Sequence, residues 1–196
     1  FHVSNMRPVG LPPLPGMREF EEINVRTYVR HGDVPGIWFF SLDASKLVPS
    51  VAARYTYGLP YYKAQIDFST TQSWHAFSHK RTGPPAAEFG ASWRAGQRLR
   101  APDKESLAFF LVERYCAFAV QRDQVQQIRI YHHPWILSEA MVNLHSSSLI
   151  AALGLAEPVS EPLAHFTEPM DVEIWPPAEA QSMGEPRSRR IAVRAS

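Results

Sequence analysis

The residues from Arg54 to Ala64 constrain the fold most, because a helical pattern ends there and a strand pattern begins. Apolar residues before this point recur at the spacing of one helix face, which predicts a helix over residues 46–57. Gly58 is placed to end that helix with a positive φ angle, and Pro60 prevents the helix from resuming. Residues 60–68 are then expected to form a strand, whose side chains alternate between the two faces of a sheet.

The alternation along this strand places Tyr61 and Lys63 on one face and Tyr62 on the other. On an interior face, a lysine beside a tyrosine is a candidate for proton transfer or for ligand binding. On an outer face, the same two residues are a solvated surface feature. The sequence leaves both interpretations open.

Further strand patterns occur along the chain, and polar or proline-rich turns separate them. They cover residues 24–29, 36–42, 73–81, 87–94, 115–120, 125–131 and 172–175. Asp103 is expected to cap a short helix, and the apolar spacing from Leu137 to Leu144 predicts a third helix that Gly154 ends. We therefore expect an α+β fold, built on a mostly antiparallel curved sheet or barrel with about three helices.

The length of 196 residues suits one domain, which we expect to span residues 1–176. The polar residues 177–196 are expected to be a disordered tail. The net charge of +1 creates no field that would draw the chain to nucleic acid or to an anionic membrane, so neither is expected as a partner. The single Cys116, the lack of a signal-peptide pattern and the lack of a long apolar run favour the cytoplasm.

The sequence has no glycine-rich phosphate loop, Cys-x-x-Cys pair or His-Glu-x-x-His motif, so no cofactor is expected. Two histidine pairs are candidates for metal ligands. His132 and His133 are neighbours on a strand and point to opposite faces. His75 and His79 share a face, but strand geometry separates them by about 13 Å. We therefore expect no metal site.

Arg26 and Tyr28 share one face of the strand expected at residues 24–29. An arginine that points into a closed pocket binds a carboxylate through two parallel hydrogen bonds. An arginine that points outwards is a solvated charge. Both placements of Arg26 remain open at this point.

Five segments of the chain are informative together: Glu22–Val29, Pro35–Ala44, Gly58–Tyr62, Glu113–Tyr115 and His133–Trp135. In this order they resemble the YqjF-like family of bacterial proteins, which carry a domain of unknown function, and the resemblance extends over about residues 1–175. It implies membership of the acetoacetate decarboxylase-like superfamily, whose fold is a cone-shaped antiparallel β-barrel around a central cavity. Family members usually begin with further strands, so the resemblance implies a half-open barrel here and a homo-oligomer formed through its open edge.

Enzymes of this superfamily use a Schiff-base lysine in a segment similar to Gly-x-Pro-Lys-Lys-x-Ala. The matching segment is Gly58–Ala64, in which Tyr61 and Tyr62 stand in place of both lysines. A tyrosine cannot form an imine, so the resemblance does not carry over Schiff-base decarboxylation. It does imply that Arg26 holds a substrate carboxylate, as an arginine does in these enzymes.

We therefore expect a barrel-like protein that binds a small organic acid, or a similar small molecule, in a central cavity without Schiff-base chemistry. The expected ligand-binding residues are Arg26, Tyr28, Tyr61, Tyr62 and Lys63. Two alternatives stay open. One is an enzyme in which Tyr61 or Lys63 moves protons, and the other is a non-catalytic structural or interaction protein with an aromatic, filled interior.

Overall fold

The computed structural model describes residues 2–4, 19–46 and 56–180, which form strands for the most part. The helices α2 (Leu107–Val112) and α3 (Leu149–Ala152) are short. The strands are β1 (His2–Ser4), β2 (Glu19–His31), β3 (Val34–Ala44), β4 (Tyr61–Thr71), β5 (Trp74–Arg81), β6 (Glu88–Arg98), β7 (Cys116–Gln121), β8 (Gln124–His132), β9 (Leu137–Ser147), β10 (His165–Thr167), β11 (Val172–Ile174) and β12 (Ala178–Glu179).

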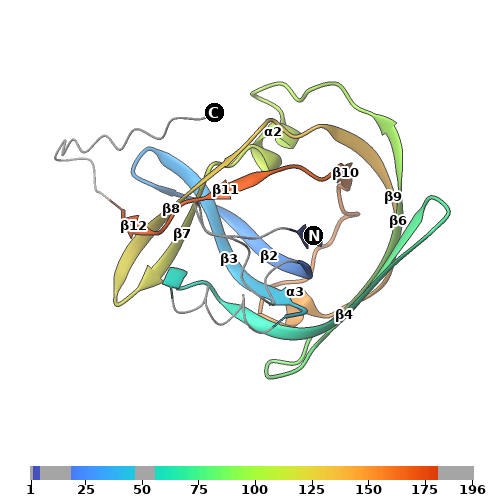
Figure 1. Ribbon diagram of the computed structural model, residues 1–196, viewed down its shortest axis with the longest axis horizontal. Helices are drawn as coiled ribbons and strands as arrows, with labels where there is room; N and C mark the ends of the chain where they lie inside the picture. Colours follow the sequence, from blue (N-terminus) through green and yellow to red (C-terminus); the bar gives the residue numbers. More distant parts are fainter. Residues whose placement is uncertain (1, 5–18, 47–55, 181–196) are drawn as a thin grey trace.

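These twelve strands form one curved sheet (Figure 1). Its main path runs β10-β9-β6-β5-β4-β3-β7-β8-β11, while β2 joins β3, β1 joins β2 and β12 joins β8. In Figure 1, β4, β6 and β9 follow an arc on one side, β7 and β8 lie on the other, and β2 and β3 cross between them. The expected mostly antiparallel sheet with few helices is confirmed. The described strands do not close on themselves, so a barrel is not confirmed.

The sheet divides at β3. One edge of β3 pairs with β2 in antiparallel orientation along nearly its whole length. The other edge pairs in parallel orientation with β7 near Ile37 and with β4 from Leu42 onwards. This division brings the start of β4 beside the end of β3, so that Tyr61 meets Glu22 of β2 there.

Tight hairpin turns connect strands at two places, where the sequence has polar turn residues between strand patterns. Gly32, between β2 and β3, has a φ of 58°, and Arg122 and Asp123, between β7 and β8, have φ values of 52° and 61°. Positive φ angles in two-residue turns match the right-handed twist of the strands that they join. Gly58 likewise has the positive φ, 67°, that its expected capping role requires. Residues 47–55 of the helix expected before it lie outside the described residues.

The helix expected from Leu137 is wrong, because this segment forms β9 and pairs with β6. A bulge in β9 inserts one residue between Leu144 and Ser146, which shifts the side chains beyond it by one position relative to the sheet. The apolar residues that suggested a helix, Leu137, Ala140, Met141 and Leu144, all precede this bulge, so their helix-like spacing is a local coincidence within the strand. Only α3 is helical in this region, and Gly154, with a φ of 69°, follows it.

Two smaller expectations are corrected at other positions. Ser106, rather than Asp103, caps α2, because its Oγ accepts a hydrogen bond from the Phe109 backbone N–H at 3.2 Å. Ala178 and Glu179 were expected in the disordered tail, but they form β12 against β8. Residues 181–196 of that tail lie outside the described residues.

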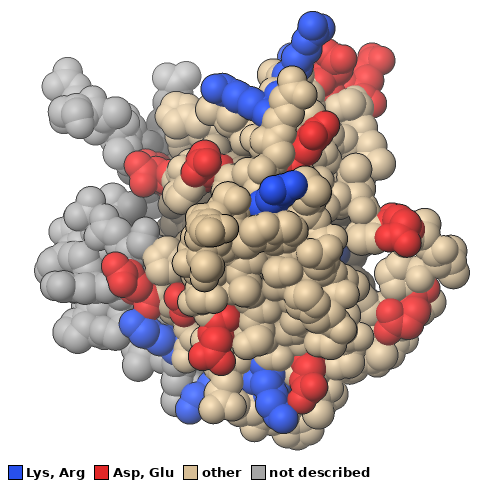
Figure 2. Space-filling model, turned by 90° about the vertical axis from the view of Figure 1, so that its right-hand side faces the viewer, with Lys and Arg blue, Asp and Glu red and all other residues tan. Residues whose placement is uncertain are grey.

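A buried apolar cluster joins β3, β7 and β8 at the division of the sheet, and consists of Ile37, Ala117, Ala119 and Ile128. The molecular face in Figure 2 carries Lys and Arg interspersed with Asp and Glu around a broad uncharged area. Among the described residues, no helix has the length and apolar character needed to cross a membrane.

Candidate functional site

Two arginines, Arg26 of β2 and Arg114, both lie against the ring of Tyr28. Arg26 Nη2 donates to the Leu111 carbonyl at 3.3 Å, and the Tyr28 hydroxyl donates to the same oxygen at 2.8 Å. The guanidinium carbons of Arg26 and Arg114 lie 5.9 Å and 5.4 Å from the Tyr28 ring centroid. Arg114 also lies 4.2 Å from the centroid of Phe110 in α2. We call Arg26 and Arg114 the arginine pair.

The arginine pair has no carboxylate at ion-pair distance among the described residues. Arg114 Nη1 donates to the Glu113 carbonyl at 2.8 Å, whereas its buried Nε finds no hydrogen-bond partner within the described part of the chain. Burial lowers the pKa of Arg114; Tyr28 opposes this effect more weakly, and the like charge of Arg26 adds a still smaller lowering. Two neighbouring, partly buried cations of this kind suit the binding of an anion such as a carboxylate.

Tyr61 binds a buried carboxyl group near the start of β2. Its hydroxyl donates to Glu22 Oε2 at 2.9 Å, and Asn24 Nδ2 lies 3.4 Å from Glu22 Oε1. Burial raises the pKa of Glu22 above its ordinary value, although both hydrogen bonds act in the opposite direction. Burial and the nearby Glu22 also raise the pKa of Tyr61, so Tyr61 remains a protonated donor.

Strand alternation places Glu22, Asn24, Arg26 and Tyr28 on the same face of β2, which we call the β2 polar face. Strand rise separates the Cα atoms of Glu22 and Arg26 by about 13 Å. The Glu22–Tyr61 contact and the arginine pair are thus two ends of one face. That Arg26 and Tyr61 line a single enclosed cavity stays a prediction.

Tyr62 and Lys63 are placed differently from the other predicted residues. The Tyr62 ring lies 4.0 Å from the guanidinium carbon of Arg81, which forms two hydrogen bonds with the carboxylate of Asp43. Tyr62 therefore packs on a buried ion pair. Lys63 is exposed, and its carbonyl accepts hydrogen bonds from the backbone and hydroxyl of Thr82.

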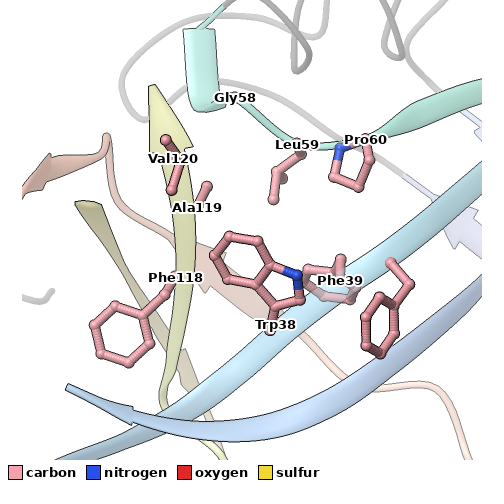
Figure 3. A pocket seen from close by; sticks show the side chains of 9 residues that line it. Trp38, Phe39, Gly58, Leu59, Pro60, Phe118, Ala119 and Val120 are labelled. Atoms are coloured by element: carbon pink, nitrogen blue, oxygen red, sulfur yellow. The ribbon is translucent and has the colours of Figure 1, made fainter. Parts of the chain in front are cut away.

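Two pockets lie near these residues. The larger, of about 280 Å³, opens at the division of the sheet and has no charged side chain in its wall (Figure 3). In Figure 3, Trp38 occupies the middle of the view, with Leu59 and Pro60 above it. The smaller, of about 100 Å³, is lined by Glu22, Ile23, Phe77, Phe89 and Trp93. None of the five predicted ligand-binding residues lines either pocket, but Glu22 connects the smaller one to the β2 polar face.

Sequence reasoning missed Glu22 and Arg114. Glu22 follows two other glutamates within four residues, a pattern typical of a solvated strand end. Arg114 lies between Glu113 and Tyr115, a pattern typical of a local ion pair, yet Glu113 instead accepts hydrogen bonds from Tyr115 and from the backbone of Trp135. One signal was available: polar residues occupy every second position of β2 from Glu22 onwards. In the described residues, no group of three or more His, Cys, Asp or Glu side chains is placed to hold a metal.

The raised pKa of Glu22 predicts a pH-dependent effect of Glu22→Gln. The native state holds the Glu22 proton more tightly than the unfolded state does, so the protonated carboxyl group favours the native state. This contribution to stability is fully present below the ordinary carboxyl pKa, and it is lost as pH rises through the folded pKa. Glutamine keeps an acceptor for Tyr61 and cannot ionise. We expect Glu22→Gln to melt about 2–4 °C above the wild type at pH 8, with little difference at pH 4. The exposed Glu19→Gln serves as control, and an equal difference at both pH values would contradict the prediction.

Sequence comparison identifies relatives of this chain. Residues 1–171 match the family model DUF2071, described as an uncharacterized conserved protein. The uncharacterized protein YqjF of Bacillus subtilis (strain 168) is 35% identical over 176 residues, which cover 90% of this chain and 73% of YqjF.

Structural comparison adds the fold. A crystal structure of acetoacetate decarboxylase from Legionella pneumophila superposes with a TM-score of 0.50 at 18% identity, covering 80% of this chain and 64% of that enzyme. An acetoacetate decarboxylase-like enzyme from Sphingomonas wittichii RW1 gives a TM-score of 0.46 at 14% identity, covering 82% and 66%. The chain thus spans just under two thirds of these solved structures, and at such identities the likeness shows the fold alone. The expected relationship is confirmed: the chain has an acetoacetate decarboxylase-like fold and belongs to the DUF2071 family.

Proposed function

We propose that this protein binds a small organic acid at the β2 polar face. The observation that carries the proposal is the arginine pair, held against Tyr28 with no carboxylate partner among the described residues. A ligand carboxylate would accept hydrogen bonds from both guanidinium groups and relieve their repulsion.

The rest of the ligand would extend along β2 towards Asn24 and Glu22. Glu22 offers carboxyl oxygens, and Asn24 offers an amide with both a donor and an acceptor. A second polar group on the acid, such as a hydroxyl or a carbonyl, would therefore find complementary partners at that end. This arrangement favours hydroxy acids and keto acids over simple fatty acids.

The binding proposal predicts the effect of Arg26→Ala. Thermal-shift titration with small keto acids and hydroxy acids should reveal ligands that raise the melting temperature of the wild type. We expect Arg26→Ala to weaken their binding about 10- to 100-fold, because a charged hydrogen bond is lost. Arg26→Lys should recover only part of this loss, because lysine has no planar fork of donors.

Arg30→Ala is the matched control for this experiment. Arg30 lies on the same face of β2 but is exposed and pairs only with the nearby Asp33 among the described residues. Its removal should leave binding unchanged. Carboxylates that bind Arg26→Ala as tightly as the wild type would overturn the proposal.

The site predicts that Schiff-base chemistry is absent. Tyr61 and Tyr62 cannot form an imine, and Lys63 is exposed. Borohydride treatment in the presence of a keto acid should leave the mass of the protein unchanged. A covalent adduct that disappears in Lys63→Ala would show this prediction to be wrong.

The raised pKa of Glu22 favours one alternative function, that of an enzyme which moves protons. Glu22 lies in a buried setting with Tyr61 as its donor, and a carboxyl group of this kind suits general acid–base catalysis. Exchange of ligand hydrogens with deuterium from solvent, followed by NMR, tests this alternative. Exchange that Glu22→Gln abolishes without loss of binding would support an enzyme, and no exchange would leave a binding protein.

A further inference from the structure

The short helix α2 is made of apolar residues alone, yet none of them is buried. Leu107 exposes 62% of its surface and Phe110 exposes 46%. A helix at a protein surface normally turns polar side chains to the solvent and buries an apolar stripe. Large apolar side chains that stay exposed side by side often mark a binding surface. We call Leu107 and Phe110 the α2 apolar patch.

The α2 apolar patch adjoins the arginine pair. The guanidinium carbon of Arg114 lies 4.2 Å from the centroid of the Phe110 ring. The ring of Tyr28, which both arginines contact, lies 4.9 Å from the same ring at a tilt of 48°. Leu107 precedes Phe110 by three residues, a spacing that makes two side chains neighbours on one face of a helix. A carboxylate bound by Arg114 would therefore lie close to exposed apolar surface.

Both members of the arginine pair keep donors for a ligand. Arg26 and Arg114 are partly exposed. Among the described residues, the hydrogen bonds of each guanidinium use one Nη atom, and both acceptors are backbone carbonyls. The second Nη atom of each therefore remains for a ligand carboxylate. The site thus offers cationic donors at one end and an apolar surface directly beside them.

The chemistry of the α2 apolar patch favours an uncharged aromatic group. Neither the first nor the last turn of α2 carries a charged side chain. A second charged group on the ligand would lose hydration there without gaining a partner. An aromatic ring can instead pack against Phe110 in a tilted or offset arrangement, which adds attraction to the burial of apolar surface. The patch therefore suits the side chain of a monocarboxylic acid.

We propose that the acid bound at the β2 polar face is a 2-oxo or 2-hydroxy monocarboxylic acid with an aromatic side chain. This inference rests on the proposed function, because the arginine pair holds the carboxylate in both. The oxygen on the second carbon would lie towards Asn24, and the aromatic side chain would pack on Phe110 and Leu107. The ligand would thereby cover the apolar surface that α2 leaves exposed.

Three probes separate the parts of this ligand. 3-Phenyllactate carries the carboxylate, the hydroxyl group and the ring, lactate lacks the ring, and 3-phenylpropane-1,2-diol lacks the carboxylate. Isothermal titration calorimetry at pH 7 and fixed ionic strength measures the Kd of each. We expect 3-phenyllactate to bind at least about tenfold more tightly than either of the others, because each of them loses one of the two main contacts.

Two variants test the α2 apolar patch directly. Phe110→Ala should weaken the binding of 3-phenyllactate about fivefold or more, and Leu107→Ala about two- to threefold, because each removes apolar surface under the ring. Both should leave lactate binding unchanged. Phe68→Ala is the matched control and should change neither affinity. Phe68 is 42% exposed on β4, and its ring contacts His75 and Trp93. If Phe110→Ala does not fold, Leu107→Ala still decides the question.

The results distinguish this inference from the proposed function. If Arg26→Ala leaves the binding of both acids unchanged, or if neither acid binds, both are wrong. If the two acids bind through Arg26 with equal affinity, or if Phe110→Ala weakens them equally, the proposed function stands and the aromatic side chain is wrong.

Size-exclusion chromatography tests whether a second copy of the chain covers α2 instead. We expect the wild type, Phe110→Ala and Leu107→Ala to elute at the same volume at every protein concentration. A wild type that dimerises, together with monomeric Phe110→Ala and Leu107→Ala, would overturn the inference.

Discussion

Replacing Asp43 by asparagine is expected to lower the free energy of unfolding by about 3–5 kcal/mol. The side chains of Asp43 and Arg81 have no exposed surface, and the two are joined by two hydrogen bonds. Asparagine would leave the Arg81 charge buried without its counter-ion. The remaining Arg81 contacts, with the Pro85 carbonyl and the Tyr62 ring, cannot replace a full negative charge. Urea unfolding of both proteins at pH 7 measures the difference.

The pH dependence of the free energy of unfolding gives a second test of Asp43→Asn. Burial raises the pKa of Asp43, but hydrogen bonds and charge from Arg81 and His79 outweigh burial, so the net pKa is lowered. The ionised Asp43 carboxylate therefore stabilises the native state fully above the ordinary carboxyl pKa, and this contribution is lost as pH falls through the folded pKa. The difference between wild type and Asp43→Asn should shrink in acid.

Asp33→Asn is the matched control for Asp43→Asn. Asp33 pairs with Arg30 at 3.5 Å, but both side chains are mostly exposed, so this pair contributes little to stability. We expect Asp33→Asn to change the free energy of unfolding by less than about 1 kcal/mol. Equal effects of the two variants would show that the Asp43–Arg81 pair is not a buried ion pair in solution.

Gly58→Ala is expected to destabilise the protein by about 2–4 kcal/mol, and Gly154→Ala by only about 1 kcal/mol. Both glycines have positive φ angles, 67° and 69°, so alanine meets the same backbone strain at both positions. An added Cβ at Gly58 would lie 2.9 Å from the Val120 carbonyl oxygen, whereas nothing lies within 4 Å of one at Gly154. The difference between the two variants therefore isolates the close approach of Gly58 to β7.

Gly58→Ala should also disturb the Glu22–Tyr61 contact, because Gly58 lies three residues before Tyr61. Urea unfolding supplies the two free energies, and the pH dependence of melting reports on Glu22. A Gly58→Ala variant that is no less stable than Gly154→Ala would mean that β7 moves away readily, and that Gly58 is needed for its φ angle alone.

Local patterns predicted much of the sheet, because strand alternation and turn residues are recorded within a few positions of sequence. The hairpin at Arg122-Asp123 and the positive φ of Gly58 are examples. The segment from Leu137 was wrongly predicted as a helix, because its partner β6 lies about 50 residues earlier and the local spacing of its apolar residues happens to match one helix face. Long-range pairing decides such cases, and a single sequence does not display it.

The candidate site residues likewise divide into those that local patterns indicate and those that depend on long-range strand pairing. Arg26, Tyr28 and Tyr61 were found because their strands could be recognised and a family motif covers them. Glu22 resembles a surface charge until β3 and β4 bury it. The grouping of Asp43, His79 and Arg81 depends on the pairing of β3, β4 and β5, which no local spacing reveals.

The division of the sheet at β3 sets the order in which the strands can assemble. β2 and β3 are joined by a two-residue turn, whereas Ile37 of β3 and Ala117 of β7 lie 80 positions apart in the chain. Closing so long a loop is entropically costly, and such distant pairings slow folding. The hairpin of β2 and β3 should therefore form early and its pairing with β7 late. Until β7 arrives, that edge of β3 is free to pair with another unfinished chain, so refolding yield should fall as protein concentration rises.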